Sequence, residues 1–297
     1  MKCDLCPRKC LVDRKKGEKG ICGQTENLKV ARAALHFWEE PCISGDAGSG
    51  AVFFSGCPLH CVFCQNENIA NGTVGKEISL ERLVDIFLEL QEKRANNINL
   101  VTPGHFVPQI VKALDQARRE GLTLPVVYNT SSYETVDTIK MLEGCVDIYL
   151  PDFKYMSPVL SKKYSHAPDY AQVAKAAIAE MVRQTGKAVF VNGDEDNLIL
   201  SGTIVRHLTL PGCMADSIQI LKYLHETYGD MIYISIMNQF TPLSNLEKYP
   251  ELNRRITDEE YETLVDYAID IGIENGFIQE GDTAEESFIP AFDCEGV

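Results

Sequence analysis

The feature that most constrains the fold of this chain is a regular alternation of short apolar runs and amphipathic segments between residues 51 and 275. AVFFSG at 51–56, INLVT at 98–102 and PVVYNT at 125–130 are typical of buried strands. After the first of them, Ser79 is placed to cap a helix whose apolar residues recur at helical spacing. About six such strand-then-helix units succeed one another, and this order predicts an α/β fold with a parallel sheet.

The same patterns predict the remaining elements. Helices are expected over 107–120, from Tyr133 onward, and over 168–185, 215–228 and 257–275, and strands are expected at VDIYLPDFK, TIVRHLTLPG and MIYISIM, with AVFVN as an extra strand or a paired preface to a late unit. No linker divides this region, so we expect one domain. The tail 280–297 is expected to lie against the surface or to fray.

Polar or glycine-containing signatures follow the apolar strands. They read SGC, TPGH, NTSS, PDFK, LPG and MNQF. In parallel sheets, whether open or closed into a barrel, the chemistry gathers at the carboxyl ends of the strands. The sequence therefore places six candidate site loops on one rim.

The charge and the apolar patterning of the chain argue against nucleic-acid and membrane partners. A formal net charge of -15 and a pI near 4.9 would repel a phosphate backbone, so we expect no nucleic acid. No apolar run approaches the roughly eighteen residues of a membrane span, and the chain opens on charged, cysteine-rich sequence, so we expect a cytoplasmic protein with no membrane partner. In a reducing compartment its cysteines suit metal ligation, catalysis or the core better than disulfides.

Three of these cysteines stand in the loop GCPLHCVFCQN after the first predicted strand: Cys57, Cys61 and Cys64. Spacings of three and two residues between the thiols allow three thiolates to hold three irons of a cubane cluster while the fourth iron stays open. The alternative is a set of three reduced structural cysteines. An open iron would be a reaction site, whereas a closed structural site uses four protein ligands.

This CxxxCxxC motif, at the end of a first β-strand, resembles the radical S-adenosylmethionine (SAM) superfamily. The resemblance implies a 4Fe-4S cluster, SAM chelated to the open iron through its methionine amino and carboxylate groups, reductive cleavage of SAM and hydrogen abstraction by the resulting 5'-deoxyadenosyl radical. It implies a partial (β/α)6 TIM-like barrel. It also implies a low-potential electron donor such as flavodoxin or ferredoxin.

Within the superfamily the chain is most similar to pyruvate formate-lyase activating enzymes, in a branch with an N-terminal cysteine-rich segment. PDFKY matches the family's Asp-x-Lys and implies that Asp152 and Lys154 lie near the cofactor, and RHLTLPG implies the same for His207. The family's glycine-glycine-glutamate loop is absent. TPGH stands there instead, and Gly104 is its expected cofactor-binding residue.

Two further rim residues are candidates for the cofactor site. Asn129 and Ser131 end the third predicted strand and are suited to the ribose or carboxylate oxygens of SAM. Asn and Ser are also the residues that turns prefer, so an ordinary turn is the alternative.

The N-terminal segment carries a second cysteine set, Cys3, Cys6, Cys10 and Cys22, with nearby glycines that permit tight turns. Four thiolates make a closed site, which suits either zinc or a second 4Fe-4S cluster; spacing does not choose between them. Non-ligating cysteines are the alternative, although so short a segment has little other means of folding. We therefore expect a cysteine-rich segment over 1–48 and a radical SAM core with its C-terminal tail over 49–297.

The expected function is that of a radical SAM oxidoreductase that abstracts hydrogen, with a glycine of a partner glycyl-radical enzyme as the target implied by the resemblance. A radical modifier of a peptide or a small molecule is the alternative. A non-catalytic iron-sulfur or zinc protein is the second alternative. The set of three cysteines favours an enzyme, because no fourth cysteine stands close in sequence to close the site.

Overall fold

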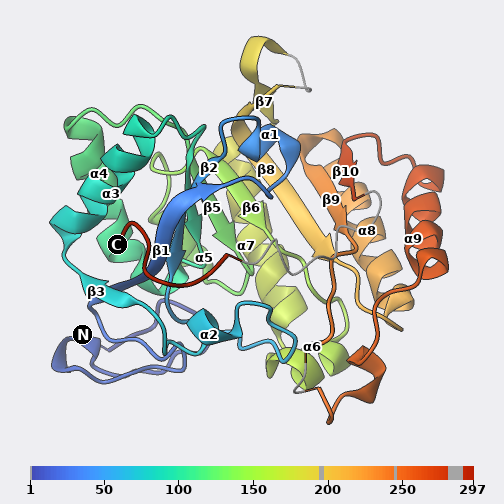
Figure 1. Ribbon diagram of the computed structural model, residues 1–297. Coiled ribbons are helices and arrows are strands. Elements are labelled where there is room, and N and C mark those ends of the chain that lie inside the picture. Colours follow the sequence, from blue (N-terminus) through green and yellow to red (C-terminus); the bar gives the residue numbers. More distant parts are fainter. Residues whose placement is uncertain (1, 194–196, 244–245, 280–289) are drawn as a thin grey trace.

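A computed structural model describes residues 2–193, 197–243, 246–279 and 290–297 (Figure 1). Its strands are β1 (Leu28–His36), β2 (Ser49–Phe54), β3 (Lys76–Ile78), β4 (Ile98–Val101), β5 (Val126–Thr130), β6 (Ile148–Pro151), β7 (Val189–Phe190), β8 (Ile199–Leu208), β9 (Tyr233–Met237) and β10 (Gly276–Ile278). Its α-helices are α1 (Pro41–Ser44), α2 (Glu67–Ala70), α3 (Leu80–Glu92), α4 (Val107–Arg119), α5 (Val136–Lys140), α6 (Pro158–Ser165), α7 (Tyr170–Thr185), α8 (Met214–Tyr228) and α9 (Asp258–Asp270).

The strands form one curved sheet in the order β10-β9-β8-β6-β5-β4-β2-β1-β3, with β7 paired to β8. From β2 to β10 along this order every neighbouring pair is parallel, whereas β1 runs antiparallel to β2. Helices α3 and α4 cover one end of the sheet and α8 and α9 the other (Figure 1). β10 and β3 are the two ends of this order, so the described sheet stays open, and the predicted partial barrel is confirmed.

Most predicted elements are confirmed. The helix after the first strand begins where Ser79 Oγ accepts a hydrogen bond from the Arg82 amide at 3.1 Å, as expected for an N-cap. The AVFVN run pairs antiparallel with the strand that follows it, so it is the paired preface. The helix expected from Tyr133 begins only at Val136 and is short.

Two outer strands near the N-terminal segment were not predicted, β1 and β3. β1 joins the sheet through β2, with Ala34 opposite Ala51 and His36 opposite Ser49. The segment over 1–48 therefore contributes a strand to the sheet of the core, and a boundary at residue 48 does not separate two sheets.

The end of the chain packs on the outside of β1, where Figure 1 shows the red C-terminal segment against that strand. Ala33 donates its amide to the Glu295 carbonyl at 2.8 Å, and Cys294 donates to the Ala31 carbonyl at 3.0 Å. The expectation that the tail lies against the surface is confirmed for residues 290–297. Residues 280–289 lie outside the described part of the chain.

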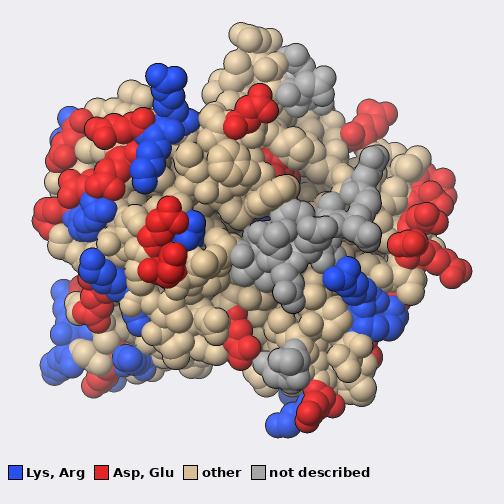
Figure 2. Space-filling model, viewed as in Figure 1, with Lys and Arg blue, Asp and Glu red and all other residues tan. Residues whose placement is uncertain are grey.

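The charged surface agrees with the acidic composition. On the face shown in Figure 2, acidic and basic side chains are interspersed over the end with α3 and α4, and acidic side chains gather over α9. Among the described helices, none is long and apolar enough to cross a membrane.

Candidate functional site

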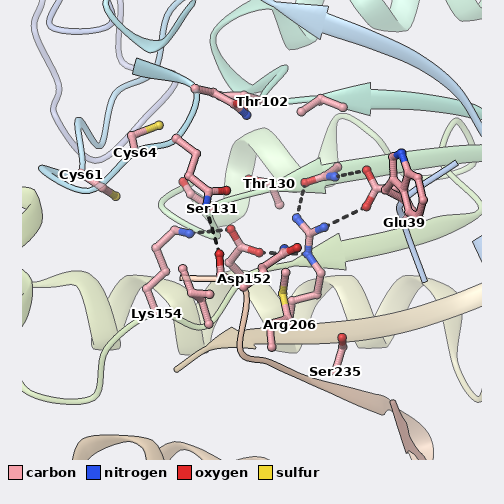
Figure 3. Close-up of a pocket in the computed structure, with 18 of the residues that line it drawn as sticks. Glu39, Cys61, Cys64, Thr102, Thr130, Ser131, Asp152, Lys154, Arg206 and Ser235 are labelled. Carbon is pink, nitrogen blue, oxygen red and sulfur yellow. Dashed lines mark hydrogen bonds and ion pairs between the residues drawn. The ribbon is translucent and has the colours of Figure 1, made fainter. Parts of the chain in front are cut away.

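A cavity of about 470 Å³ occupies the inside of the partial barrel (Figure 3). Its rim is the carboxyl end of the parallel strands, where Cys57, Cys61 and Cys64 line it. Its other end is lined by His36, Trp38, Glu39, Glu40 and Pro41. Because β1 is antiparallel and His36 pairs with the first residue of β2, this second segment lies toward the amino ends of the parallel strands. The cavity therefore extends from the cysteine loop deep into the barrel.

The cysteine loop leaves β2 through Gly56, whose φ of +94° requires glycine. A Cβ at this position would also lie 2.5 Å from the Cys22 carbonyl oxygen, so the loop packs closely on the N-terminal segment. Within the loop the Val62 amide donates to the Tyr164 carbonyl at 2.8 Å, and the Cys64 amide donates to the Cys61 carbonyl at 3.0 Å. These bonds hold the three thiols at one end of the cavity.

The three thiols fit the cluster that the motif implies. Burial, followed by the nearby Cys61 thiolate, raises the pKa of Cys57 to about 11 and of Cys64 to about 12. A bound metal reverses such shifts because it binds the thiolate form. Among the described lining residues no fourth cysteine is present, which leaves room for one open iron. No described set of His, Cys, Asp or Glu converges on a single metal ion, whereas a cubane takes each thiolate on a separate iron.

A buried ion pair lies next to the thiols, where Figure 3 shows Lys154 between Cys61 and Asp152. Lys154 Nζ lies 2.7 Å from Asp152 Oδ2. Burial opposes both charges, yet each residue holds the other ionised: the pKa of Asp152 is lowered and the pKa of Lys154 is raised. Both side chains line the cavity, in agreement with their expected place.

Arg206 is the centre of the polar network (Figure 3). Its guanidinium donates to Asp152 Oδ1 at 3.0 Å, to Glu39 Oε2 at 2.9 Å and to Asn129 Oδ1 at 2.7 Å. Asn129 in turn donates to Glu39 Oε1 at 3.2 Å. The amide of Asn129 lines the cavity as predicted, but it already has partners on both sides within this network.

The loops after β4 and β5 supply the remaining predicted rim residues. Ser131 lines the main cavity beside Thr102, which has a left-handed φ of +56°. Gly104 lies outside the main cavity, in a small pocket that it shares with Cys6 and Ser131. A Cβ at Gly104 would lie 2.7 Å from the Glu134 carboxylate, so this glycine permits close packing there.

His207 also lies outside the main cavity. Its Nδ1 donates to the Phe153 carbonyl at 2.8 Å, and its Nε2 accepts from Ser217 Oγ at 2.8 Å. Burial lowers its pKa to about 4, so the ring is neutral. The neighbouring Arg206 and Leu208 point to the other face of β8 and line the cavity.

Sequence reasoning missed Arg206, Glu39, Glu40 and Trp38 as lining residues. The signal for Arg206 was present, because strand alternation places it opposite His207. The other three follow β1, a strand that was itself not predicted, so nothing placed them at the cavity.

The N-terminal cysteines come together beside the cysteine loop. Burial, then proximity to Cys22, Cys10 and Cys3, raises the pKa of Cys6 to about 12, opposed only by a backbone hydrogen bond. The segment is attached through His60 Nε2, which donates to the Ile21 carbonyl at 2.7 Å. The two cysteine sets thus belong to adjoining segments.

Comparisons with known proteins agree with this geometry. Residues 51–197 match the family described as the radical SAM superfamily. An uncharacterised protein of Methanocaldococcus jannaschii is 27% identical over 275 residues, which cover 90% of this chain and 74% of that protein.

Two solved structures share the fold. Streptococcus suis SuiB bound to S-adenosylmethionine matches with a TM-score of 0.52 and 11% identity over 80% of this chain and 51% of that one. HydG, a maturase of the FeFe hydrogenase, matches with a TM-score of 0.52 and 15% identity over 76% of this chain and 50% of that one. The chain spans about half the length of these two proteins, and the likeness concerns the fold alone.

The superfamily match includes the three-cysteine loop that lines the cavity, and it carries with it a 4Fe-4S cluster and SAM as cofactors. Motif, cavity and fold are consistent with one another: residues 51–197 belong to the radical SAM superfamily, and the chain is a radical SAM enzyme.

Proposed function

We propose that this enzyme abstracts a hydrogen atom from a compact polar substrate, a small molecule or a peptide side chain, held inside the barrel. The observation that carries the proposal is a single cavity with three thiols at its rim and buried charged side chains at its inner end. Charged groups inside a barrel are costly to bury and suit a ligand with complementary polar groups.

The second candidate is activation of a glycyl-radical enzyme, which rests on the resemblance to pyruvate formate-lyase activating enzymes. A glycine residue offers only backbone groups to Arg206 and its carboxylate partners. The charged lining therefore favours the first candidate, and the motif resemblance favours the second.

Residue roles follow from the position of each side chain. Cys57, Cys61 and Cys64 would hold the 4Fe-4S cluster. When bound, the cluster and SAM supply a reductively generated organic radical that abstracts hydrogen, with the electron coming from a donor such as flavodoxin or ferredoxin. Lys154 holds a buried positive charge beside the thiols, which suits the carboxylate of SAM, and Asp152 orients Lys154 through their ion pair.

We also propose that Cys3, Cys6, Cys10 and Cys22 hold a second metal site. Support comes from its position: Cys6 shares a small pocket with Thr102, Thr130 and Ser131, which also line the main cavity. A 4Fe-4S cluster there would be placed to pass an electron toward the three-cysteine loop. Zinc, which would only fix the fold of the segment, is the alternative, and it would require the thiols to draw together, because no described set converges on a single ion.

The test of the enzyme proposal is anaerobic. The protein is reconstituted with iron and sulfide, reduced with dithionite and given SAM, and 5'-deoxyadenosine is quantified. We expect the product from the wild type and from Cys145→Ser, a control cysteine that does not line the cavity, and none from Cys64→Ser. If wild-type protein that demonstrably carries a cluster forms no product, or if Cys64→Ser forms as much, the proposal is wrong.

A further inference from the structure

The inner end of the cavity contains a carboxylate that the described residues leave partly without hydrogen bonds. Glu40 lines the cavity and is only 8% exposed. Its Oε2 has no hydrogen-bond partner among the described residues. A buried polar atom without a partner costs free energy, and native structures retain few of them without a reason.

The surroundings of Glu40 are otherwise well paired. Arg206 is shared between Asp152 and Glu39, and Lys154 is taken by Asp152. The Ser235 side chain hydrogen-bonds to the Glu40 carboxyl. Arg206 also acts on Glu40 through its charge, but within the described residues no cation makes a close ion pair with Glu40.

The charged side chains that line the cavity include more acidic than basic groups. Among the described lining residues, three carboxylates, Glu39, Glu40 and Asp152, face two cations, Lys154 and Arg206. His36 also lines the cavity, but burial lowers its pKa to about 4 and leaves it neutral near pH 7. Burial raises the pKa of Glu40, so the empty cavity favours its neutral form and a bound cation would hold it ionised. With Glu40 ionised, the described lining residues carry one negative charge in excess.

Aromatic side chains lie at the same end. Trp38, Phe53 and Phe277 line the cavity; Trp38 is 58% exposed, so one side of it is open to solvent. An indole face attracts an ammonium group through its quadrupole, and Trp is the best of the aromatic residues in this respect. Carboxylate and aromatic groups together are the usual recognition elements for an organic cation.

The position of this end separates it from the cluster. In Figure 3, Glu39 and Ser235 lie beyond Asp152 and Arg206 as seen from Cys61 and Cys64. Glu40 follows Glu39 in the chain and bonds to Ser235. A ligand bound to the Glu40 carboxylate is therefore separated by the Arg206 network from a cofactor held at the thiols.

We propose that the inner end of the cavity is the substrate subsite and takes a compact primary amine in its ammonium form, which donates a hydrogen bond to Glu40 and lies near Trp38. This deepens the proposed function and rests on it, since it names the chemical class of the substrate. It assigns to Glu40 the role of specificity-determining residue.

The test compares two probes of equal size, n-butylamine and n-butanol. Binding is measured by ligand-observed NMR titration of the anaerobically reconstituted protein near pH 7, with saturating SAM and no reductant. We expect the amine to bind about tenfold more tightly than the alcohol, as a hydrogen bond to a charged group implies. We also expect the affinity for the amine to be the same with and without SAM.

Three variants test whether the preference for the amine comes from Glu40. Glu40→Gln should remove the preference for the amine, Glu40→Asp should retain part of it, and Glu92→Gln, an exposed carboxylate on α3, should leave it intact. Thermal unfolding of each variant checks that it is folded.

Equal binding of the two probes, no binding of either, a preference that survives in Glu40→Gln, or displacement of the amine by SAM would each overturn the proposal. Displacement would mean that Glu40 serves the cofactor. The two proposals fail separately: absence of 5'-deoxyadenosine with an intact amine preference is evidence against SAM cleavage alone, whereas 5'-deoxyadenosine without the preference is evidence against the subsite alone.

Discussion

Arg206 shows how one residue organises the inside of the barrel. Its guanidinium contacts side chains from β5, from the end of β6 and from the segment after β1. Five donors in a planar fork allow this, and a lysine has neither the number nor the geometry. Because the side chains of Arg206 and Glu39 are only 13% and 8% exposed, neither charge is satisfied by water instead.

Replacing Arg206 by Met should therefore leave Glu39 without its cation and Asp152 with Lys154 alone. We expect Arg206→Met to lower the free energy of unfolding by about 3 kcal/mol, the range found when one partner of a buried ion pair is removed. The measurement is urea denaturation. Arg119→Met, which removes an exposed ion pair with Asp115 on α4, should change stability by less than about 1 kcal/mol.

A double variant tests whether the broken ion pair with Glu39 causes this loss of stability. Adding Glu39→Gln to Arg206→Met removes the carboxylate that lost its cation and should recover part of the lost stability. If the double variant is less stable by the sum of the two single losses, the pair does not couple and the network is not the source of the effect.

Residues with a chemical signature in sequence were predicted best. The thiols of the three-cysteine loop, Asp152 and Lys154 line the cavity where the motifs placed them. Gly104 and His207 came from the resemblance alone, and the structure puts both outside this cavity. Glu39 and Glu40 carry no motif at all, because their place depends on how the chain closes the barrel rather than on local spacing.

At the level of elements, β8 shows why alternation is informative. Its residues point alternately to the cavity and to the helices behind the sheet, which sends Arg206 inward and His207 against Ser217 of α8. His207 is therefore held neutral between a carbonyl that requires a donor and a hydroxyl that supplies one.

This arrangement predicts acid sensitivity. The pKa of His207 falls from its ordinary 6.5 to about 4 in the folded protein, so the unfolded chain binds a proton at higher pH than the folded chain does. Protonation thus favours unfolding, and stability is lost as the pH falls from about 6.5 toward about 4. Between pH 7 and pH 5 the loss due to His207 should be about 2 kcal/mol.

The check is urea denaturation at pH 7 and pH 5 for the wild type and His207→Asn. Asn keeps a donor for the Phe153 carbonyl but does not titrate, so the variant should lose about 2 kcal/mol less than the wild type over this interval. Any loss of an iron-sulfur cluster at pH 5 should affect the wild type and the variant alike under matched anaerobic conditions, so it cancels in the comparison. Equal losses in the two proteins would show that His207 is not the titrating group.

Regular elements with strong local signals were predicted, and outer ones were not. α3 has an N-cap, a helical apolar stripe and a buried face, so local pattern and tertiary packing agree. The short β3 and β10 have three residues each, too few for any periodicity to register. α1 and α2 are single turns whose position is fixed by their neighbours rather than by propensity.

For the whole molecule, the question is how the N-terminal segment is joined to the radical SAM core. Arg8 makes one of the side-chain connections between the N-terminal segment and the core. Its guanidinium donates to the Pro58 carbonyl at 2.9 Å in the cysteine loop and to the Ser165 carbonyl at 2.9 Å at the end of α6, and it lies 5.0 Å from the centre of the Tyr133 ring. Ser165 Oγ in turn lies 3.1 Å from Cys61 Sγ.

Arg8, which belongs to the segment that carries the second cysteine set, thus ties that segment to the loop that carries the first. Removing the Arg8 guanidinium should therefore loosen the N-terminal segment and the cysteine loop together. We expect Arg8→Met to speed amide hydrogen exchange in residues 2–26 and in residues 57–60, with no change in α9. Arg8→Lys, which keeps the charge but cannot reach several carbonyls at once, should give a smaller effect in the same two places.

The comparison of the two regions decides what Arg8 does. If exchange accelerates only in residues 2–26, the N-terminal segment is an appendage that the cysteine loop does not need for its own order. If both regions accelerate in proportion, the order of the loop that would carry the cluster depends on the cysteine-rich segment. Because Arg8 bonds to the loop backbone on one side of Cys61 and to the partner of Cys61 on the other, the second result is the one that its contacts predict.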